Sequence, residues 1–258
     1  MNSLYALRRE ICEVGRRIYQ RGYVAANDGN ISIRLDTERI LCTPTGISKG
    51  FMAEDMLAIC NMEGQQLAGQ MKISSEIRMH LEVYKLREDI RAVVHAHPPT
   101  ATGFAVAGIE LTQCVLPEVV IGLGGIPLAD YGTPGGPDIV EPMKPLLREY
   151  DAVLMANHGV VTLGKDVMDA HFKMETVEHF AKIALVARQL GAVHTLNEQQ
   201  VGDLIQLRQR FGVEGRPTCD LGASDAFNQM ANETGQADLI EEITRQVLLQ
   251  LQEGNRGE

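Results

Sequence analysis

The chain has 258 residues, of which 45% are hydrophobic and 22% charged, an ordinary composition for a globular protein with an ample core. Its formal net charge of -10 argues against a general nucleic-acid or anionic-membrane surface, so an anionic ligand needs a local site. The five scattered cysteines lack a C-x-x-C motif, and neither an apolar signal core nor a run of about 18 apolar residues is present, which together indicate a reduced, cytoplasmic protein without a cysteine zinc cluster.

The N-terminal part predicts an amphipathic helix, short strands and two polar loops. A turn sequence ending at Asn30 favours a hairpin, or alternatively a loop whose N–H groups and Asn30 amide meet an anion. After a strand at 40–42, the loop 43–50 offers small donors around Thr45 and Gly46. Such a loop suits a phosphate, although hydroxyl-rich loops are common in proteins without one.

A helix is predicted to begin near Ser74 and to run to about residue 86. Ser74 or Ser75 can cap this helix, and Glu76 brings a carboxylate into its first turn. Glu76 is either a surface residue that compensates the helix dipole or a carboxylate aimed into a site, where exposed N–H groups also favour a phosphate. His80 is interpreted as an ordinary, partly exposed histidine.

The stretch 92–97, with the sequence Ala-Val-Val-His-Ala-His, is the most informative part of the chain. Its apolar lead predicts a buried strand, on which His95 and His97 share one face at a separation of roughly 6–7 Å. Two prolines follow at once and end the strand. The pair is therefore either hydrogen-bonded at a strand terminus or able to converge on one metal ion.

The second half predicts further strands and helices around two more candidate residues. A helix is expected at 100–107, and two short strands around a glycine turn are expected at 119–128, with Glu118 at the mouth of the first or in a site. Prolines break the helix expected at 137–150. The hairpin 152–163 is interrupted by the sequence Asn-His-Gly, which places His158 at a strand end.

The C-terminal part predicts two helices, a linker and a last helix. The helices span 166–190 and 197–211. Residues 212–236 are rich in Gly, Asn, Ser, Asp and Thr and are interpreted as a flexible linker. An amphipathic pattern predicts the last helix within 237–258.

Three histidines on two strand ends and one carboxylate at a helix start form a possible metal site. The residues are His95, His97, His158 and Glu76. Three nitrogen ligands with an exchangeable fourth position are typical of a catalytic zinc site. Zinc in such a site can polarise a carbonyl and stabilise an enediolate.

Five motifs in order resemble the class II aldolase/adducin family, and within it the zinc-dependent L-fuculose-phosphate aldolases. They are Gly29-Asn30-Ile31-Ser32, Thr43-Pro44-Thr45-Gly46, Ser74-Ser75-Glu76, His95-Ala96-His97 and Asn157-His158-Gly159. The resemblance implies an α/β fold, a three-layer α/β/α sandwich around a mostly antiparallel sheet, formed by a catalytic domain at 1–211. It also implies a homotetramer with sites at subunit interfaces.

The resemblance assigns a role to each motif. The three histidines would bind Zn²⁺, and Glu76 would be a fourth ligand at rest and an acid/base once the substrate enters. The substrate phosphate would be held by Asn30, Thr45, Gly46, Ser74 and Ser75. The implied reaction is retro-aldol cleavage of a deoxyketose 1-phosphate, L-fuculose 1-phosphate or L-rhamnulose 1-phosphate, to dihydroxyacetone phosphate and lactaldehyde.

Departures from the family pattern leave alternatives open. Glu118 aligns with a tyrosine that those aldolases use as a proton donor near the aldehyde. Either Glu118 takes over this role, or the aldehyde specificity differs from that of those aldolases. Ribulose-phosphate 4-epimerases share the scaffold but usually carry Asp in place of Glu76. A methylthioribulose-phosphate dehydratase or aldolase is a further alternative. An adducin-like binding module is the non-enzyme alternative, and that branch lacks the metal histidines that are present here.

The tail resembles the encapsulation peptides that target enzymes to bacterial microcompartment shells. These peptides are short amphipathic helices behind a polar linker, as is predicted for 237–258. The resemblance implies a shell protein as a partner and a location inside a microcompartment. The alternative is a helix that packs on its own tetramer.

Overall fold

A computed structural model describes residues 3–133, 135–213 and 219–221 of the chain. Its strands are β1 (Asn30–Arg34), β2 (Arg39–Cys42), β3 (Ala58–Asn61), β4 (Gln66–Ala68), β5 (Ala92–Ala96), β6 (Leu128–Ala129), β7 (Ala152–Met155) and β8 (Gly159–Gly164). They form one sheet in the order β4-β3-β2-β1-β5-β8-β7-β6. Only β6 and β7 pair in parallel, which confirms the predicted, mostly antiparallel sheet.

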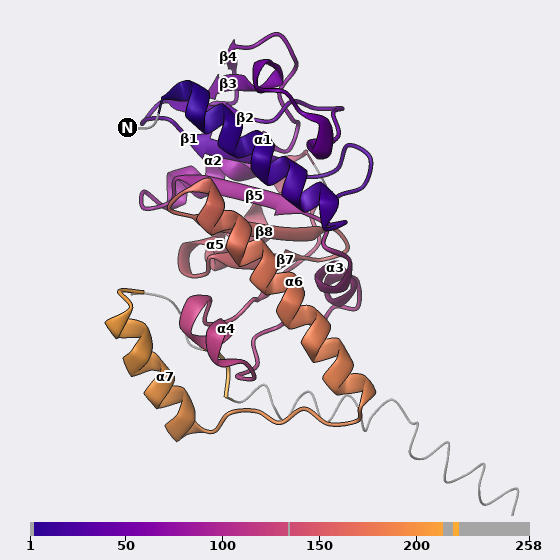
Figure 1. Cartoon of the computed structure of the whole chain (residues 1–258), viewed down its shortest axis with the longest axis vertical. Coiled ribbons are helices and arrows are strands. Elements are labelled where there is room, and N and C mark those ends of the chain that lie inside the picture. The colour runs from indigo at the N-terminus through magenta and orange to yellow at the C-terminus, as the bar shows by residue number, and fades with distance from the viewer. Residues whose placement is uncertain (1–2, 134, 214–218, 222–258) are drawn as a thin grey trace, which may run out of the picture.

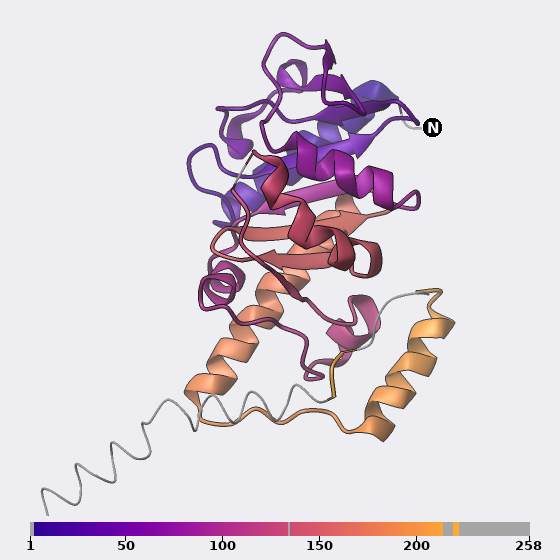
Figure 2. The same ribbon diagram turned by 180° about the vertical axis from the view of Figure 1, so that it is seen from behind.

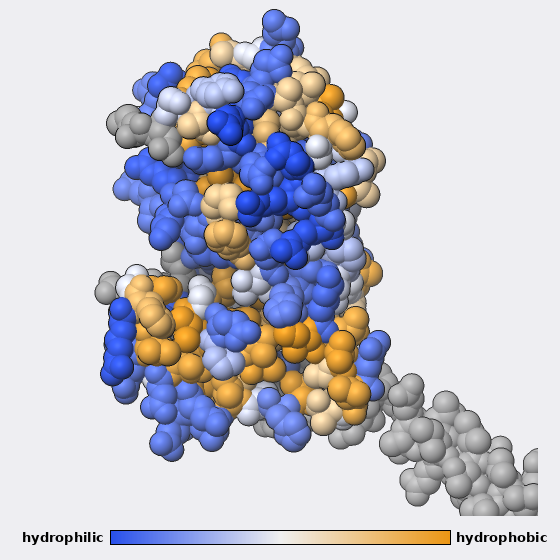
Figure 3. Space-filling view, viewed as in Figure 1, coloured by the Kyte–Doolittle hydropathy of each residue, from blue (hydrophilic) through white to orange (hydrophobic). Residues whose placement is uncertain are grey.

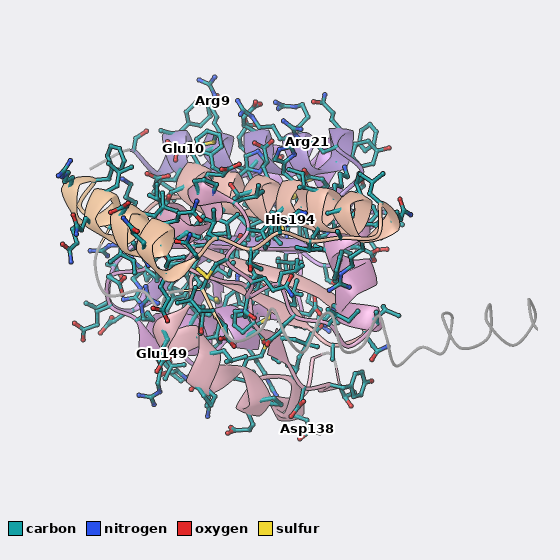
Figure 4. All side chains as sticks on the ribbon, turned by 90° about the horizontal axis from the view of Figure 1, so that it is seen from below. Arg9, Glu10, Arg21, Asp138, Glu149 and His194 are labelled. Atoms are coloured by element: carbon teal, nitrogen blue, oxygen red, sulfur yellow. A yellow bond between two sulfur atoms is a disulfide. The ribbon has the colours of Figure 1, made fainter. Side chains whose placement is uncertain are left out.

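Helices cover both faces of this sheet (Figures 1 and 2). The helices are α1 (Leu4–Gln20), α2 (Ile77–Leu86), α3 (Pro99–Val106), α4 (Pro117–Gly122), α5 (Lys144–Glu149), α6 (Val167–Gln189) and α7 (Glu198–Arg210). Helices α1, α3 and α6 pack on one face, whereas α2 and α5 pack on the other. Seen along the sheet in Figure 4, Arg9 of α1 and Arg21 just after this helix lie opposite Glu149 of α5. The α/β/α sandwich is therefore confirmed.

The central strands explain this layering because they are apolar on both faces. Along β5, Ala92 and Val94 belong to the core under α1 and α6, whereas Val93 belongs to the core under α2. The side chains of β7 and β8 alternate between the two cores in the same way. On β5, the four side chains of residues 92–95 are fully buried. A sheet with two apolar faces is stable only when helices cover both.

One predicted strand is wrong. Residues 119–121 belong to α4, which begins at Pro117 with Glu118 in its first turn. Proline is tolerated at the first position of a helix, and Val120 packs against Val201 of α7, so tertiary packing outweighs the β-branched composition. The broken helix predicted for 137–150 is confirmed as two 3-10 turns, η3 (Pro137–Ile139) and η4 (Glu141–Met143), followed by α5.

The cysteine prediction also needs correction, because Cys114 and Cys219 form a disulfide (Figure 4). Cys114 precedes α4 and Cys219 follows α7, and the packing of these helices brings the two residues together. The N–H of Asp220 donates to the carbonyl of Thr112, which adds a second tie at this point. The stretch 219–221 of the predicted linker is thus held on the domain, while the last predicted helix lies outside the described residues.

Exposed apolar side chains gather on the part of the molecule formed by α4, α6 and α7 (Figure 3). Val186, Leu190 and Phe211 are 53%, 81% and 66% exposed. Phe172 of α6 is also 52% exposed. Among the described helices, none combines the length and apolar character needed to cross a membrane.

Candidate metal centre and active site

The ends of two strands bring three histidines together. His95 lies on β5, on the α2 face of the sheet, and His97 follows just after this strand. His158 belongs to the tight turn between β7 and β8, where Asn157 adopts a positive φ of 56°. The ring centroids of the three histidines lie 4.8 to 5.1 Å apart.

Gly159 allows this close arrangement. A Cβ atom at Gly159 would lie 2.5 Å from Cδ2 of His97 and 2.6 Å from the carbonyl oxygen of Ala96. Any side chain at this position would therefore displace the β5 end or its histidine.

The nitrogen atoms of the cluster face one another. Nε2 of His95 and Nε2 of His97 are 3.1 Å apart, and one nitrogen from each of the three rings lies within 4.8 Å of the others. Tetrahedral zinc, with Zn–N bonds of about 2.0–2.1 Å, separates its nitrogen ligands by about 3.3 Å. The geometry therefore fits a metal ion after small side-chain adjustments.

Neighbouring groups orient two of the rings. Nδ1 of His95 lies 2.9 Å from the carbonyl oxygen of Val160, which can only accept, so Nδ1–H donates and Nε2 presents a lone pair to the cluster. Nδ1 of His97 lies 3.6 Å from a carboxylate oxygen of Asp28. Burial lowers the pKa of His95 to about 3 and also lowers that of His97, so both rings are neutral, as metal ligands must be.

Glu76 completes the cluster from the N-cap position of α2, one residue before the helix begins. Its carboxylate oxygens lie 3.2 Å from Nε2 of His158 and 3.7 Å from Nε2 of His95. The amide of Asn30 donates to Glu76 at 2.6 Å. Burial alone would raise the pKa of Glu76, but the hydrogen bond with His158 and the attraction of His95 and His158 lower it to about 2. The carboxylate is therefore ionised.

The loops predicted to hold a phosphate lie side by side next to Glu76. Pro44 and Ile73 form an isolated antiparallel bridge, and the N–H of Thr45 donates to the carbonyl of Lys72 at 2.9 Å. This pairing brings Thr45 and Gly46 beside Ser74 and Ser75. Gly46 has a φ of +73°, Ser74 accepts from the N–H of Glu76, and Ser75 is exposed.

A row of polar contacts, called here the β1–α2 polar ladder, fixes α2 on the sheet. Its contacts are Asn30–Glu76, Ser32–His80, Ser32–Tyr84 and Arg34–Tyr84. The hydroxyl of Ser32 lies 2.7 Å from Nδ1 of His80 and 2.8 Å from the hydroxyl of Tyr84. His80 is thus fully buried rather than partly exposed, because its partners come from a strand some fifty residues away in sequence. Burial lowers its pKa to about 4.

Glu118, a predicted catalytic residue, does not lie beside the histidine cluster in the described part of the chain. It lines two surface hollows with residues of α6, including Phe172 and Thr176, and neither hollow contains a cluster histidine or Glu76. Sequence reasoning also missed Asp28, which it read only as a turn residue, and the carbonyl of Val160. A carboxylate directly before the Gly29-Asn30 motif is the signal that could have indicated Asp28.

An α/β/α sandwich with three histidines and a carboxylate converging at its strand ends is typical of a metal-dependent enzyme. The model of the class II aldolase and adducin N-terminal domain family matches residues 9–185, and the chain belongs to this family. It is an enzyme of the class II aldolase type.

Relatives of this chain carry two different names. An L-fuculose phosphate aldolase of Methanococcus maripaludis is 35% identical over 181 residues, which cover 70% of this chain and 97% of the relative. A 3-oxo-tetronate 4-phosphate decarboxylase of Haemophilus influenzae is 35% identical over 196 residues, which cover 74% of this chain and 92% of the relative.

Solved structures support the same fold. An L-fuculose 1-phosphate aldolase has a TM-score of 0.72 and 26% identity, covering 80% of this chain and 96% of that one. The crystal structure of YgbL from Klebsiella pneumoniae has a TM-score of 0.73 and 28% identity, covering 79% of this chain and 100% of that one.

Proposed function

We propose that this protein is a zinc-dependent aldolase that cleaves a deoxyketose 1-phosphate. The proposed substrates are L-fuculose 1-phosphate and L-rhamnulose 1-phosphate, and the products are dihydroxyacetone phosphate and lactaldehyde. The observation that carries the proposal is the convergence of His95, His97 and His158 beside the ionised carboxylate of Glu76. The relatives that are named L-fuculose phosphate aldolase support the choice of substrate class.

In this proposal the three histidines hold the metal through Nε2, and Glu76 moves the proton. When bound, zinc would polarise the substrate's keto group and offset the negative charge of the enediolate. Glu76 accepts the proton of the C4 hydroxyl as the C3–C4 bond breaks and returns it to the enediolate carbon after the aldehyde has left. The Asn30 amide, which donates to Glu76, keeps this carboxylate at the mouth of the cluster.

The phosphate is held by the paired loops beside Glu76. Thr45 and Gly46 from one loop, Ser74 and Ser75 from the other, and the Asn30 amide supply hydroxyl and N–H donors. The α2 N-terminus adds a favourable dipole. Glu118 would act near the aldehyde only from a second subunit, because within one chain it lies apart from the cluster.

A second candidate reaction is the decarboxylation of a 3-oxo-tetronate 4-phosphate. Relatives with this name are as similar to the chain as the aldolases, and the sequence alone did not suggest this alternative. Loss of carbon dioxide from such a substrate leaves the same enediolate of dihydroxyacetone phosphate that the aldolase reaction forms. The metal cluster, the phosphate loops and Glu76 would therefore serve both reactions, and the two differ only in the group that leaves.

The test is a substrate panel with two detection methods. Zinc-loaded protein is assayed with ketose 1-phosphates, ribulose 5-phosphate and a 3-oxo-tetronate 4-phosphate, and both dihydroxyacetone phosphate and the second product are measured. Lactaldehyde supports the aldolase, and carbon dioxide would assign the decarboxylase. Glu76→Gln should keep zinc, because three histidines remain, but lose a factor of about 10²–10⁴ in turnover. A Glu76→Gln protein with wild-type turnover would remove Glu76 from the mechanism.

The proposal also includes the assembly and the tail. We propose a homotetramer built on the catalytic domain 1–211, in line with the exposed apolar side chains of α6 and α7. Residues 212–236 would link this domain to 237–258, which would dock on a microcompartment shell protein. Deletion of 237–258 should leave activity and the tetramer intact, and the segment fused to a fluorescent protein should co-localise with shells. A dissociated tetramer, or a fusion that stays diffuse beside shells, would contradict this role.

A further inference from the structure

Lys49 is a buried cation that the proposed mechanism does not use. It begins the 3-10 turn η1 (Lys49–Phe51) and is only 1% exposed. Helix α1 packs closely against this turn, because a Cβ atom at Gly15 would lie 2.6 Å from the carbonyl oxygen of Lys49. The Lys49 side chain extends to the loops of the candidate site.

Two loop carbonyls hold the Lys49 ammonium. Nζ donates to the carbonyl of Asn27 at 2.9 Å and to the carbonyl of Ile47 at 2.7 Å. Asn27 belongs to the loop that leads into Asn30, and Ile47 belongs to the loop of Thr45 and Gly46. One ammonium thus ties together two of the three segments to which the proposed function assigns phosphate contacts, that of Asn30 and that of Thr45 and Gly46.

The burial of this charge needs an explanation. Within the described ranges, no carboxylate forms an ion pair with Lys49, although a buried cation is normally paired with an anion because its desolvation is costly. Burial lowers the pKa of Lys49 to about 8, while the charges of Asp28 and Glu76 act in the opposite direction. At neutral pH the group therefore remains mostly cationic.

The loop geometry directs donors away from Lys49. Carbonyl and N–H point in opposite directions in a trans peptide, so the Ile47 carbonyl that faces the ammonium turns the N–H of Ser48 outward. The hydroxyl of Ser48 is buried without a hydrogen-bond partner among the described residues. A ligand with several acceptor oxygens would satisfy such groups.

We infer that Lys49 is a specificity-determining positioning residue, whose buried charge and two carbonyl contacts prepare these loops for a phosphate dianion. The substrate phosphate is the missing counter-charge, and Lys49 acts on it through the loops and through the field of its ammonium. This inference rests on the proposed function, since it assumes that the loops bind the phosphate of the substrate.

The test separates the charge from the carbonyl contacts. Lys49→Gln keeps two N–H donors for the carbonyls of Asn27 and Ile47 but removes the charge. Lys72→Met is the matched control, because it removes an exposed cation next to the same loops. Zinc content is measured for each variant, and the binding of inorganic phosphate is measured by calorimetry without any ketose.

We expect Lys49→Gln to keep its zinc and to bind inorganic phosphate about 10- to 100-fold more weakly. This factor corresponds to the Coulomb energy of one pair of unit charges about 7 Å apart at an effective dielectric constant of about 20. The KM for the ketose 1-phosphate should rise with little change in kcat, and Lys72→Met should resemble the wild type. A folded Lys49→Gln with wild-type phosphate affinity would overturn the inference.

A measurement on the unmutated chain keeps the inference testable if Lys49→Gln does not fold. The ¹³Cε signal of Lys49, assigned with Lys49→Arg, should move on addition of phosphate and saturate with the calorimetric affinity. A signal that does not move would refute the role of Lys49. Failure of the wild type to bind phosphate would instead refute the proposed phosphate loops, so the two failures are distinguishable.

Discussion

Gly159→Ala adds a single methyl group at the centre of the histidine cluster. The new Cβ would lie 2.5 Å from Cδ2 of His97 and 2.6 Å from the carbonyl oxygen of Ala96. Carbon atoms normally pack at about 3.5–4.0 Å, so the ring or the strand end has to move by about 1 Å. Metal–ligand distances tolerate only about 0.2 Å. We therefore expect zinc affinity to fall by at least about 10- to 100-fold, the range seen when groups that orient a ligand are lost.

Competition with a chromophoric chelator measures this affinity, and thermal unfolding of the metal-free protein measures the cost of overpacking, about 1–3 kcal/mol. Gly103→Ala in α3 is the matched control, because a Cβ atom there meets nothing within 4 Å. It should leave zinc binding unchanged and stabilise the protein by about 0.4–1 kcal/mol. Unchanged zinc affinity in Gly159→Ala would refute the assignment of the histidines as metal ligands.

Three further predictions concern stability. The pKa of His80 is lowered to about 4 in the folded state, below the value of about 6.5 expected on unfolding, so stability is fully present above about pH 6.5 and is lost as the pH falls toward 4. His80→Asn should reduce this loss in denaturant titrations across that pH range, and an unchanged pH dependence would contradict the assignment. Ser32→Ala leaves two buried groups unpaired and should cost about 1–3 kcal/mol for each, whereas exposed Ser75→Ala should stay within about 0.5 kcal/mol. Thiol titration of the unfolded chain without reductant should find three reactive cysteines. Cys219→Ser should lower the free energy of unfolding by up to about 5 kcal/mol, because the disulfide closes a loop with a sequence separation of 105. Five reactive thiols would show that the chain is reduced.

Helices, strands and turns that have a local sequence pattern could be predicted. The β5 strand with His95 follows from its apolar, β-branched run, and the long helix α6 follows from helical spacing. The Asn-His-Gly interruption indicated the turn that carries His158. Helix α7 begins at the capping box that Asn197 and Gln200 form, in agreement with its predicted start.

Features that depend on distant partners could not be predicted. Helix α4 has a β-branched sequence and becomes helical in contact with α7. His80 is interpreted from the sequence as partly exposed because it is polar, and the hydroxyl of Ser32 makes its burial tolerable. The Cys114–Cys219 disulfide and the Lys49 contacts likewise join segments that no periodicity connects.

The β1–α2 polar ladder limits where the chain can gain or lose residues. Its β1 members are two residues apart and span about 6.6 Å per step. On the other side, the N-cap Glu76 and the α2 residues His80 and Tyr84 are four residues apart and span about 6.0 Å per step. The two repeats stay in step because these lengths nearly match. One inserted residue within 77–83 would rotate the later members by about 100° away from β1. In alignments of relatives that keep this metal site, gaps are therefore expected at the hairpin tips around 36–38 and 62–65, whereas the segments 30–34 and 76–84 should align without gaps.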